Sequence, residues 1–193
     1  MKKKFLALTL ALALALSLAA CGGKDAPAQS GTPEPPAAST PEDGETGAPA
    51  ETEQDVDLAA FYNTLREGNT WPELMSLTED ETVTELLDSY YPGLSGISTK
   101  QCGVYIAAIS AAVGEIALVE VESAEDVQAV EDIFQARVDY QVGDGTNPGG
   151  AWYPETIEGW KTKARIVSHG KYVMLAVGDA AEAAVESFEA LFA

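Results

Sequence analysis

Positive charge, histidine and cysteine are all scarce in this chain. Its 193 residues include 11 lysines and arginines against 31 aspartates and glutamates, for a formal net charge of −20, with one histidine and two cysteines. A surface this acidic repels phosphate backbones, so we expect no nucleic-acid partner. One histidine and two cysteines are too few for a transition-metal site of the usual kind, and the sequence predicts no metal and no other cofactor.

The first 20 residues have the order of a lipoprotein signal peptide. Three lysines at positions 2–4 precede an apolar run, 5–20, that ends in Leu-Ala-Ala before Cys21. The run is shorter than the roughly 20 residues that span a bilayer as a helix. Its ending is typical of a lipobox, where cleavage precedes a cysteine whose thiol carries the lipid. We expect Cys21 to be lipidated and to anchor the protein on the extracytoplasmic face of the cell membrane; the alternative is an ordinary signal peptide.

Residues 21–56 comprise the lipidated cysteine and an acidic tether rich in proline and alanine. The tether contains no aromatic residue and almost no large aliphatic residue. Such a segment cannot bury enough apolar surface to offset the entropy lost on folding, so we predict that it is disordered. The remaining residues, 57–193, are numerous enough for a single domain that forms a core without disulfides.

Hydrophobic spacing within 57–193 predicts an α+β domain. Apolar positions at helical spacing, preceded by capping residues, predict helices over 57–68, 78–91, 124–142 and 179–192. Two pairs of Val-, Ile- and Leu-rich runs predict β-hairpins, the first pairing 104–110 with 115–122 and the second pairing 161–168 with 171–177. The expected fold is a four-stranded, mainly antiparallel sheet of two β-hairpins joined by a helix, with the N-terminal helical pair and the C-terminal helix packed on it.

The last predicted strand indicates that the sheet is covered on both faces. Val173, Leu175 and Val177 alternate with Tyr172, Met174 and Ala176, so apolar side chains point to both sides. We therefore expect the helices of 58–90 to cover part of the second face.

Short motifs in the second half of the chain resemble a known family. Glu115-Ile116-Ala117 leads into a strand, Arg137 and Gln141 follow, and Tyr153-Pro154-Glu155 and Gly170-Lys171-Tyr172-Val173 come later. Over roughly residues 75–190 this pattern is similar to a family of bacterial lipoproteins catalogued as domain of unknown function four-three-five-eight. The resemblance implies an exported, lipid-anchored protein, mostly from Gram-positive anaerobes, with no assigned activity and no functional residues to carry over. The segment 143–150 is an insertion relative to that pattern.

No catalytic residue stands out, and we expect no enzyme activity. His169 is the only histidine, and no Gly-x-Ser-x-Gly elbow is present to supply an activated serine. Cys102 with His169 is the one nucleophile-and-base pair that the chain allows, so a hydrolase or thiol enzyme using Cys102 is the alternative. Asp144, Thr146 and Asn147 offer oxygens to calcium, but their spacing fails the EF-hand pattern, and a turn-rich loop is the better interpretation.

The first candidate ligand-binding surface is basic. Lys161, Lys163 and Arg165 alternate along the predicted strand 161–168, so their side chains would share one face. The structural explanation is pairing across strands with the acidic side chains of 120 and 122.

The second candidate surface is aromatic. Trp152, Tyr153 and Trp160 cluster in a segment that also contains glycines. Aromatic side chains on a loop can stack on sugars or enter a protein partner, and they can equally hold the loop against its own core. The sequence thus favours a membrane-anchored, non-catalytic binding module that faces the cell surface or cell wall, with a wall polymer, a small solute or a protein as its partner.

Overall fold

The computed structural model describes residues 54–79, 83 and 85–193. The predictions for the signal peptide, for Cys21 and for the tether up to residue 53 lie outside the described residues. The described residues belong to one compact unit, Ala50–Ala193. The first described residue, Gln54, contacts the sheet, because its carbonyl accepts a hydrogen bond from the Tyr172 hydroxyl at 2.9 Å.

A five-stranded antiparallel sheet forms the centre of this unit. Its strands lie in the order β1-β2-β3-β5-β4, and every neighbouring pair is antiparallel. The strands are β1 Leu74–Ser76, β2 Thr99–Ala107, β3 Glu115–Val121, β4 Ala164–His169 and β5 Tyr172–Val177. The two predicted hairpins are therefore confirmed as β2 with β3 and β4 with β5. The second hairpin turns at Gly170, whose φ of 56° is the left-handed conformation that glycine adopts without strain.

In the described part of the chain, five α-helices surround the sheet. They are α1 Leu58–Gly68, α2 Glu85–Tyr90, α3 Val127–Val142, α4 Pro154–Lys163 and α5 Ala181–Glu189. Three short 3-10 turns accompany them: η1 Leu94–Gly96, η2 Ala124–Asp126 and η3 Ala190–Phe192. The Asp57 side chain caps α1 by accepting a hydrogen bond from the Ala60 amide at 2.9 Å, as its sequence predicts.

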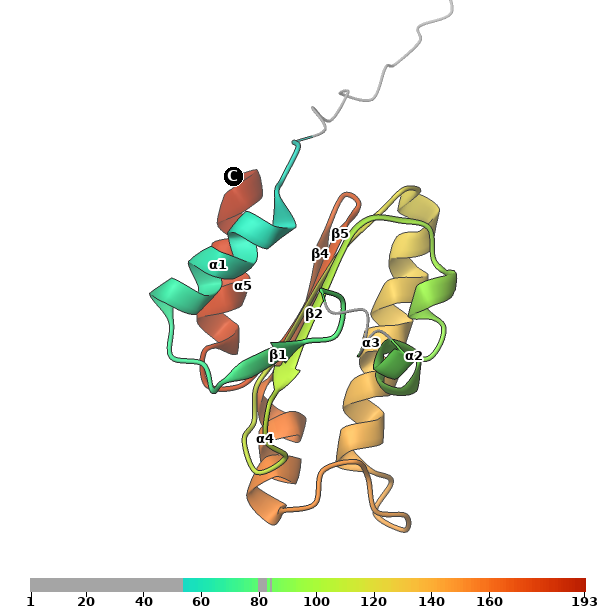
Figure 1. The fold of residues 1–193 in the computed structure, drawn as a ribbon, viewed down its shortest axis with the longest axis vertical. Helices are drawn as coiled ribbons and strands as arrows, with labels where there is room; N and C mark the ends of the chain where they lie inside the picture. The colour runs from blue at the N-terminus through green and yellow to red at the C-terminus, as the bar shows by residue number, and fades with distance from the viewer. Residues whose placement is uncertain (1–53, 80–82, 84) are drawn as a thin grey trace, which may run out of the picture. The chain divides into compact units, whose positions relative to one another are not determined.

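The helices form a layer on each face of the sheet. Figure 1 shows α1 and α5 together on one face and α2 and α3 on the other. The alternation predicted for β5 is confirmed, because Val173, Leu175 and Val177 pack in the α3 layer. Tyr172, Met174 and Ala176 pack in the layer of α1 and α5. The prediction that both faces of this strand are buried is therefore correct.

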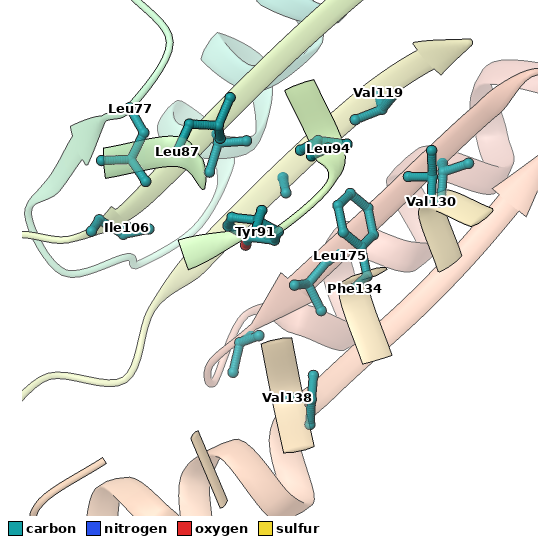
Figure 2. Close-up of a cluster of buried hydrophobic side chains, with 14 of the residues drawn as sticks. Leu77, Leu87, Tyr91, Leu94, Ile106, Val119, Val130, Phe134, Val138 and Leu175 are labelled. Carbon is teal, nitrogen blue, oxygen red and sulfur yellow. The ribbon is translucent and has the colours of Figure 1, made fainter. Parts of the chain in front are cut away.

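The core beneath α3 is built from aliphatic side chains around two aromatic rings. Figure 2 shows Phe134 of α3 and Tyr91, which directly follows α2, between residues of the sheet and residues of the helices. The two rings meet edge to face, with centroids 5.7 Å apart and an interplanar angle of 74°. Both residues are fully buried, so together they join α2 and α3 to the same face of the sheet.

The structure corrects the predicted fold in two places. The sheet has five strands rather than four, because the short segment Leu74–Ser76 pairs with Tyr105, Ile106 and Ala107 at the edge of β2. Both N-terminal helices are present and pack on the sheet, but the expectation that they cover the same face is wrong, because α1 and α2 lie on opposite faces. The strand β1 separates these helices in the chain, and three residues are too few for a periodic signal.

A third correction concerns the start of the second hairpin. The segment 161–163 ends the helix α4, and the strand β4 begins only at Ala164. Proline at position 154 suits the first turn of a helix, because its φ is already helical and its missing N–H would have no partner there. The Thr156 hydroxyl then donates to the Tyr153 carbonyl at 2.8 Å and accepts from the Tyr153 amide at 3.2 Å. These local hydrogen bonds start a helix that the strand prediction missed.

Candidate ligand-binding pocket

A pocket of about 450 Å³ opens at one end of the α3 layer. Its lining comes from α2, the end of β2 with the following connection to β3, the last turns of α3, the chain ahead of α4, and α4 itself, with Met75 of β1 and Glu115 of β3 added. Pockets that bind small ligands span roughly 300–1,000 Å³. The pocket is therefore large enough to hold a small ligand.

Exposed hydrophobic side chains gather at the rim of this pocket. Among the described residues, five large hydrophobic side chains are exposed, and three of them line the pocket: Ile109, Tyr140 and Trp152, which are 65%, 64% and 83% exposed. A fourth, Tyr153, directly follows Trp152 in the chain. A cluster of exposed apolar side chains around a concave site is typical of a binding surface, because exposed apolar residues without such a role are usually scattered singly over the surface.

The floor of the pocket holds a buried ion pair between α3 and β3. Arg137 and Glu115 are only 4% and 2% exposed. The guanidinium donates from Nε to Glu115 Oε1 at 2.8 Å and from Nη2 to Glu115 Oε2 at 2.9 Å, which is a bidentate arrangement. Burial by itself lowers the pKa of the Arg137 guanidinium, but the hydrogen bonds and the charge of Glu115 outweigh it, and the pKa is raised overall. The guanidinium therefore stays charged, and its two hydrogen bonds place this charge against the Glu115 carboxyl group.

Aromatic rings enclose the Arg137 side of this pair. The guanidinium carbon lies 4.7 Å from the centre of the Tyr90 ring, 5.2 Å from that of Trp160 and 5.7 Å from that of Tyr91. The Tyr91 hydroxyl donates to Glu115 Oε1. Burial, and then the charge of Glu115, raise the pKa of Tyr91 well above its ordinary value, so this hydroxyl keeps its proton. The rings and the hydrogen bonds hold the pair in one position beneath the pocket.

The segment 143–150 returns to the end of α3 and places Trp152 at the rim. The Gly150 amide donates to the Tyr140 carbonyl at 2.7 Å, and the Ala151 amide donates to the Gln141 carbonyl at 3.1 Å. A Cβ atom at position 150 would lie 2.3 Å from Gln141 Oε1 and 2.5 Å from the Tyr140 ring, so glycine is needed for this close approach. Gln141 Oε1 is buried, and no donor among the described residues reaches it.

The three aromatic candidates occupy different positions. Trp152 stands on the rim of the pocket, and Trp160 is buried against Arg137 in its floor. Tyr153 precedes the first residue of α4, is 49% exposed and does not line the pocket. The structure thus brings two of the three predicted aromatic residues to one site.

The basic candidates do not lie on one strand. Lys161 and Lys163 lie in the last turn of α4, and Arg165 lies in β4, so the predicted alternation along one strand is wrong. Lys163 pairs with Asp179, and Arg165 pairs with Glu182 at the start of α5. The predicted pairing with the acidic residues of β3 is also wrong, because β5 lies between β3 and β4.

The Cys102 and His169 side chains do not meet. Cys102 packs with the α3 layer, whereas the His169 ring stacks on Phe192 in the other layer, with centroids 4.2 Å apart. Two strands, β3 and β5, also separate β2 from β4. Burial raises the pKa of the Cys102 thiol to about 11, so at neutral pH the sulfur is protonated and unreactive.

The loop that offered oxygens to calcium is closed by its own hydrogen bonds. Asp144 Oδ1 accepts from the amides of Thr146 and Asn147, and Oδ2 accepts from the Asn147 side chain. These bonds make a turn, as the sequence indicates, and they lower the pKa of the Asp144 carboxyl. Within 54–79, 83 and 85–193, no group of three or more His, Cys, Asp or Glu side chains is arranged to hold a metal ion.

The functional candidates that sequence reasoning missed are the paired charges in the floor. Arg137 occupies the apolar stripe of α3, three residues after Phe134 and seven after Val130, and Glu115 begins a strand whose residues are all buried. A charge at a position where the pattern requires an apolar residue is the signal that was available. Glu115, Arg137 and Gln141 also belong to the motifs quoted for the family resemblance, and all three line the pocket.

No family model, curated protein or solved structure matches this chain. In the part of the chain that the structure describes, no helix combines the length and the apolar composition that crossing a bilayer requires.

Proposed function

We propose that this protein is a membrane-anchored extracytoplasmic lipoprotein whose folded domain is a non-catalytic binding module, with the pocket rimmed by Trp152 as its ligand site. The anchoring part rests on the sequence around Cys21 and its apolar leader. The binding part rests on the pocket. We also propose that the chain belongs with the lipoproteins that its motifs resemble.

One observation carries the proposed site. Three of the five exposed large hydrophobic side chains in the described residues surround one pocket, above a floor held by a bidentate ion pair. A rigid floor beneath an exposed aromatic rim is suited to binding, because little conformational entropy is lost when the ligand enters.

The alternative of a thiol enzyme has no support in the geometry. The Cys102 thiol faces the α3 layer, does not line the pocket, and has a pKa raised to about 11 by burial. A nucleophilic cysteine needs the opposite shift and a base beside it.

Ligand binding is tested with the full chain purified in a detergent that contains no sugar headgroup. A thermal-shift screen against glycans, wall fragments and metabolites identifies ligands, because a compound that binds only the folded state raises the melting temperature. We expect Trp152→Ala to remove the shift caused by any hit. The matched control is Tyr153→Ala, which removes an exposed aromatic ring next to the pocket but outside its lining. Equal loss in both variants, or in neither, would contradict the proposed site.

Anchoring is tested in cells with a clickable fatty-acid analogue. The wild-type protein should incorporate the label and sediment with membranes, whereas Cys21→Ser should remain unlabelled and be either released or left unprocessed. Cys102→Ser is the control, because it removes the other cysteine and should leave labelling unchanged. Label that persists in the Cys21 variant would refute the anchor.

A further inference from the structure

The described lining of the pocket carries no net charge, although the protein is strongly acidic. Among the described lining residues, Glu115 and Arg137 are the only charged ones, and they pair with each other through two hydrogen bonds. The chain as a whole has a formal net charge of −20. An anionic ligand would therefore be repelled during its approach and would find no uncommitted cation among the described lining residues. A phosphate- or carboxylate-rich ligand is disfavoured.

The aromatic rings that could receive a cation are already occupied. Tyr90, Tyr91 and Trp160 surround the guanidinium of Arg137 at 4.7 to 5.7 Å, which is the arrangement that a cationic ligand would need. The two remaining rings, those of Tyr140 and Trp152, stand on the exposed rim. The free aromatic surface is thus a platform beside the pocket and not a cage.

The rim platform is held by the backbone on both sides. Tyr140 lies near the end of α3, where its carbonyl accepts from Gly150 at 2.7 Å. Trp152 follows Ala151, which is buried and donates to the Gln141 carbonyl. These hydrogen bonds fix the backbone from which the two rings project, although the rings themselves are exposed. An indole in this position can cover the apolar face of a sugar ring.

Apart from the ion pair, the polar side chains of the described lining are uncharged and suit hydroxyl groups. Ser89 and Ser110 contribute hydroxyls, and Gln141 contributes an amide, whereas the buried Thr156 hydroxyl is already bonded to the Tyr153 backbone. Hydroxyl and amide groups both donate and accept, as the hydroxyl and N-acetyl groups of a sugar do.

Building on the proposed function, we propose that the pocket binds an uncharged saccharide, with one face of a sugar ring stacked on Trp152 and its hydroxyl groups directed toward the polar lining. The neutral floor selects against charged sugars.

The test compares tetrasaccharides that differ in charge. The full chain, in sugar-free detergent, is titrated with chitotetraose and cellotetraose as neutral probes, with the de-N-acetylated chitotetraose as the cationic probe and with tetragalacturonate as the anionic probe. The readout is tryptophan emission, which should shift to shorter wavelength when a sugar covers Trp152. We expect at least one neutral probe to bind at least tenfold more tightly than both charged probes. Its affinity should not change with salt, because no ligand charge is screened.

Two substitutions locate the binding. Trp152→Ala should lower the affinity for the neutral saccharide by roughly tenfold and abolish the emission shift. Gly150→Ala should lower this affinity as well, because the added methyl group displaces the Tyr140 ring and the Gln141 amide. Gly96→Ala is the matched control, since a Cβ there meets nothing within 4 Å, and its affinity should equal that of the wild type.

The outcomes separate this inference from the proposed function. If a charged probe binds more tightly than the neutral ones, or if no saccharide binds while another compound does, the uncharged saccharide is refuted as the ligand. The binding site stands in either case if that binding is lost in Trp152→Ala. If saccharides bind equally well to the Trp152→Ala variant, both the ligand class at this site and the site itself are refuted.

Discussion

Replacing Arg137 with methionine should destabilise the protein far more than the same replacement at the surface. Arg137→Met keeps much of the side-chain volume but removes the guanidinium, which makes both charge-assisted hydrogen bonds to Glu115. It leaves the Glu115 carboxylate buried without its cation, while the Tyr91 hydroxyl still donates to Oε1. Breaking a buried pair by removing one partner costs about 3–5 kcal/mol, because an uncompensated charge remains in the core.

The measurement is urea denaturation followed by tryptophan fluorescence, for which Trp160 beside Arg137 is a local reporter. We expect the free energy of unfolding to fall by about 4 kcal/mol and the melting temperature to fall by roughly 10–15 °C. The matched control is Arg165→Met, which breaks a pair with Glu182 at the surface. Surface pairs contribute about 0–1 kcal/mol, so this variant should remain close to the wild type.

A double variant tests whether the buried charge is the cause. Glu115→Gln combined with Arg137→Met removes the carboxylate charge and still offers the Tyr91 hydroxyl an acceptor. It should recover about 2 kcal/mol of the stability lost in Arg137→Met alone. If Arg137→Met is no worse than Arg165→Met, or if the double variant is less stable than the single one, the electrostatic account of the pocket floor is wrong.

Two further predictions follow from groups whose pKa is shifted. Because burial raises the pKa of Cys102 to about 11, only about one thiol in a thousand is ionised at pH 8. Alkylation of the folded protein should therefore be slow and should accelerate up to about pH 11, with Cys102→Ser as the blank. Rapid labelling at pH 7 would instead support the thiol-enzyme alternative. Burial raises the pKa of the Glu120 carboxyl, but hydrogen bonds from Gln101 and Lys100 outweigh it and lower the pKa overall, so Glu120 contributes stability above pH 4.5 that is lost in more acidic solution. Gln101→Met should therefore cost about 1–3 kcal/mol at pH 7 and less below pH 4, and a cost that is constant with pH would count against this assignment.

The sequence alone determined the elements whose patterns are local. The alternation along β5 shows which side chains face each layer, because successive residues of a strand point to opposite faces. The hairpin turn was readable from Gly170, and the start of α1 from Asp57, because a turn glycine and a capping aspartate act on their own neighbours. These features require only a few adjacent residues.

Local patterns failed where two of them competed. Residues 161–168 show the alternation of a strand, and Pro154 with Thr156 shows the start of a helix that extends to Lys163. The helix prevails up to Lys163, where Trp160 is buried against Arg137 and so ties α4 to α3. That contact joins residues 23 positions apart in the chain, and periodicity cannot reveal it.

Only the tertiary structure decided the pocket. Glu115 and Arg137 lie 22 residues apart, on a strand and a helix. In the sequence, each is a charged residue at a position where the pattern requires an apolar one, and only their contact in the folded protein explains it. Trp152 looked like one aromatic residue of a loop until the loop was seen to return to the end of α3 and to leave this ring on the rim. A buried charge is tolerated only beside its partner, and a cavity exists only where separate segments fail to fill the space between them. Both are properties of the assembled fold.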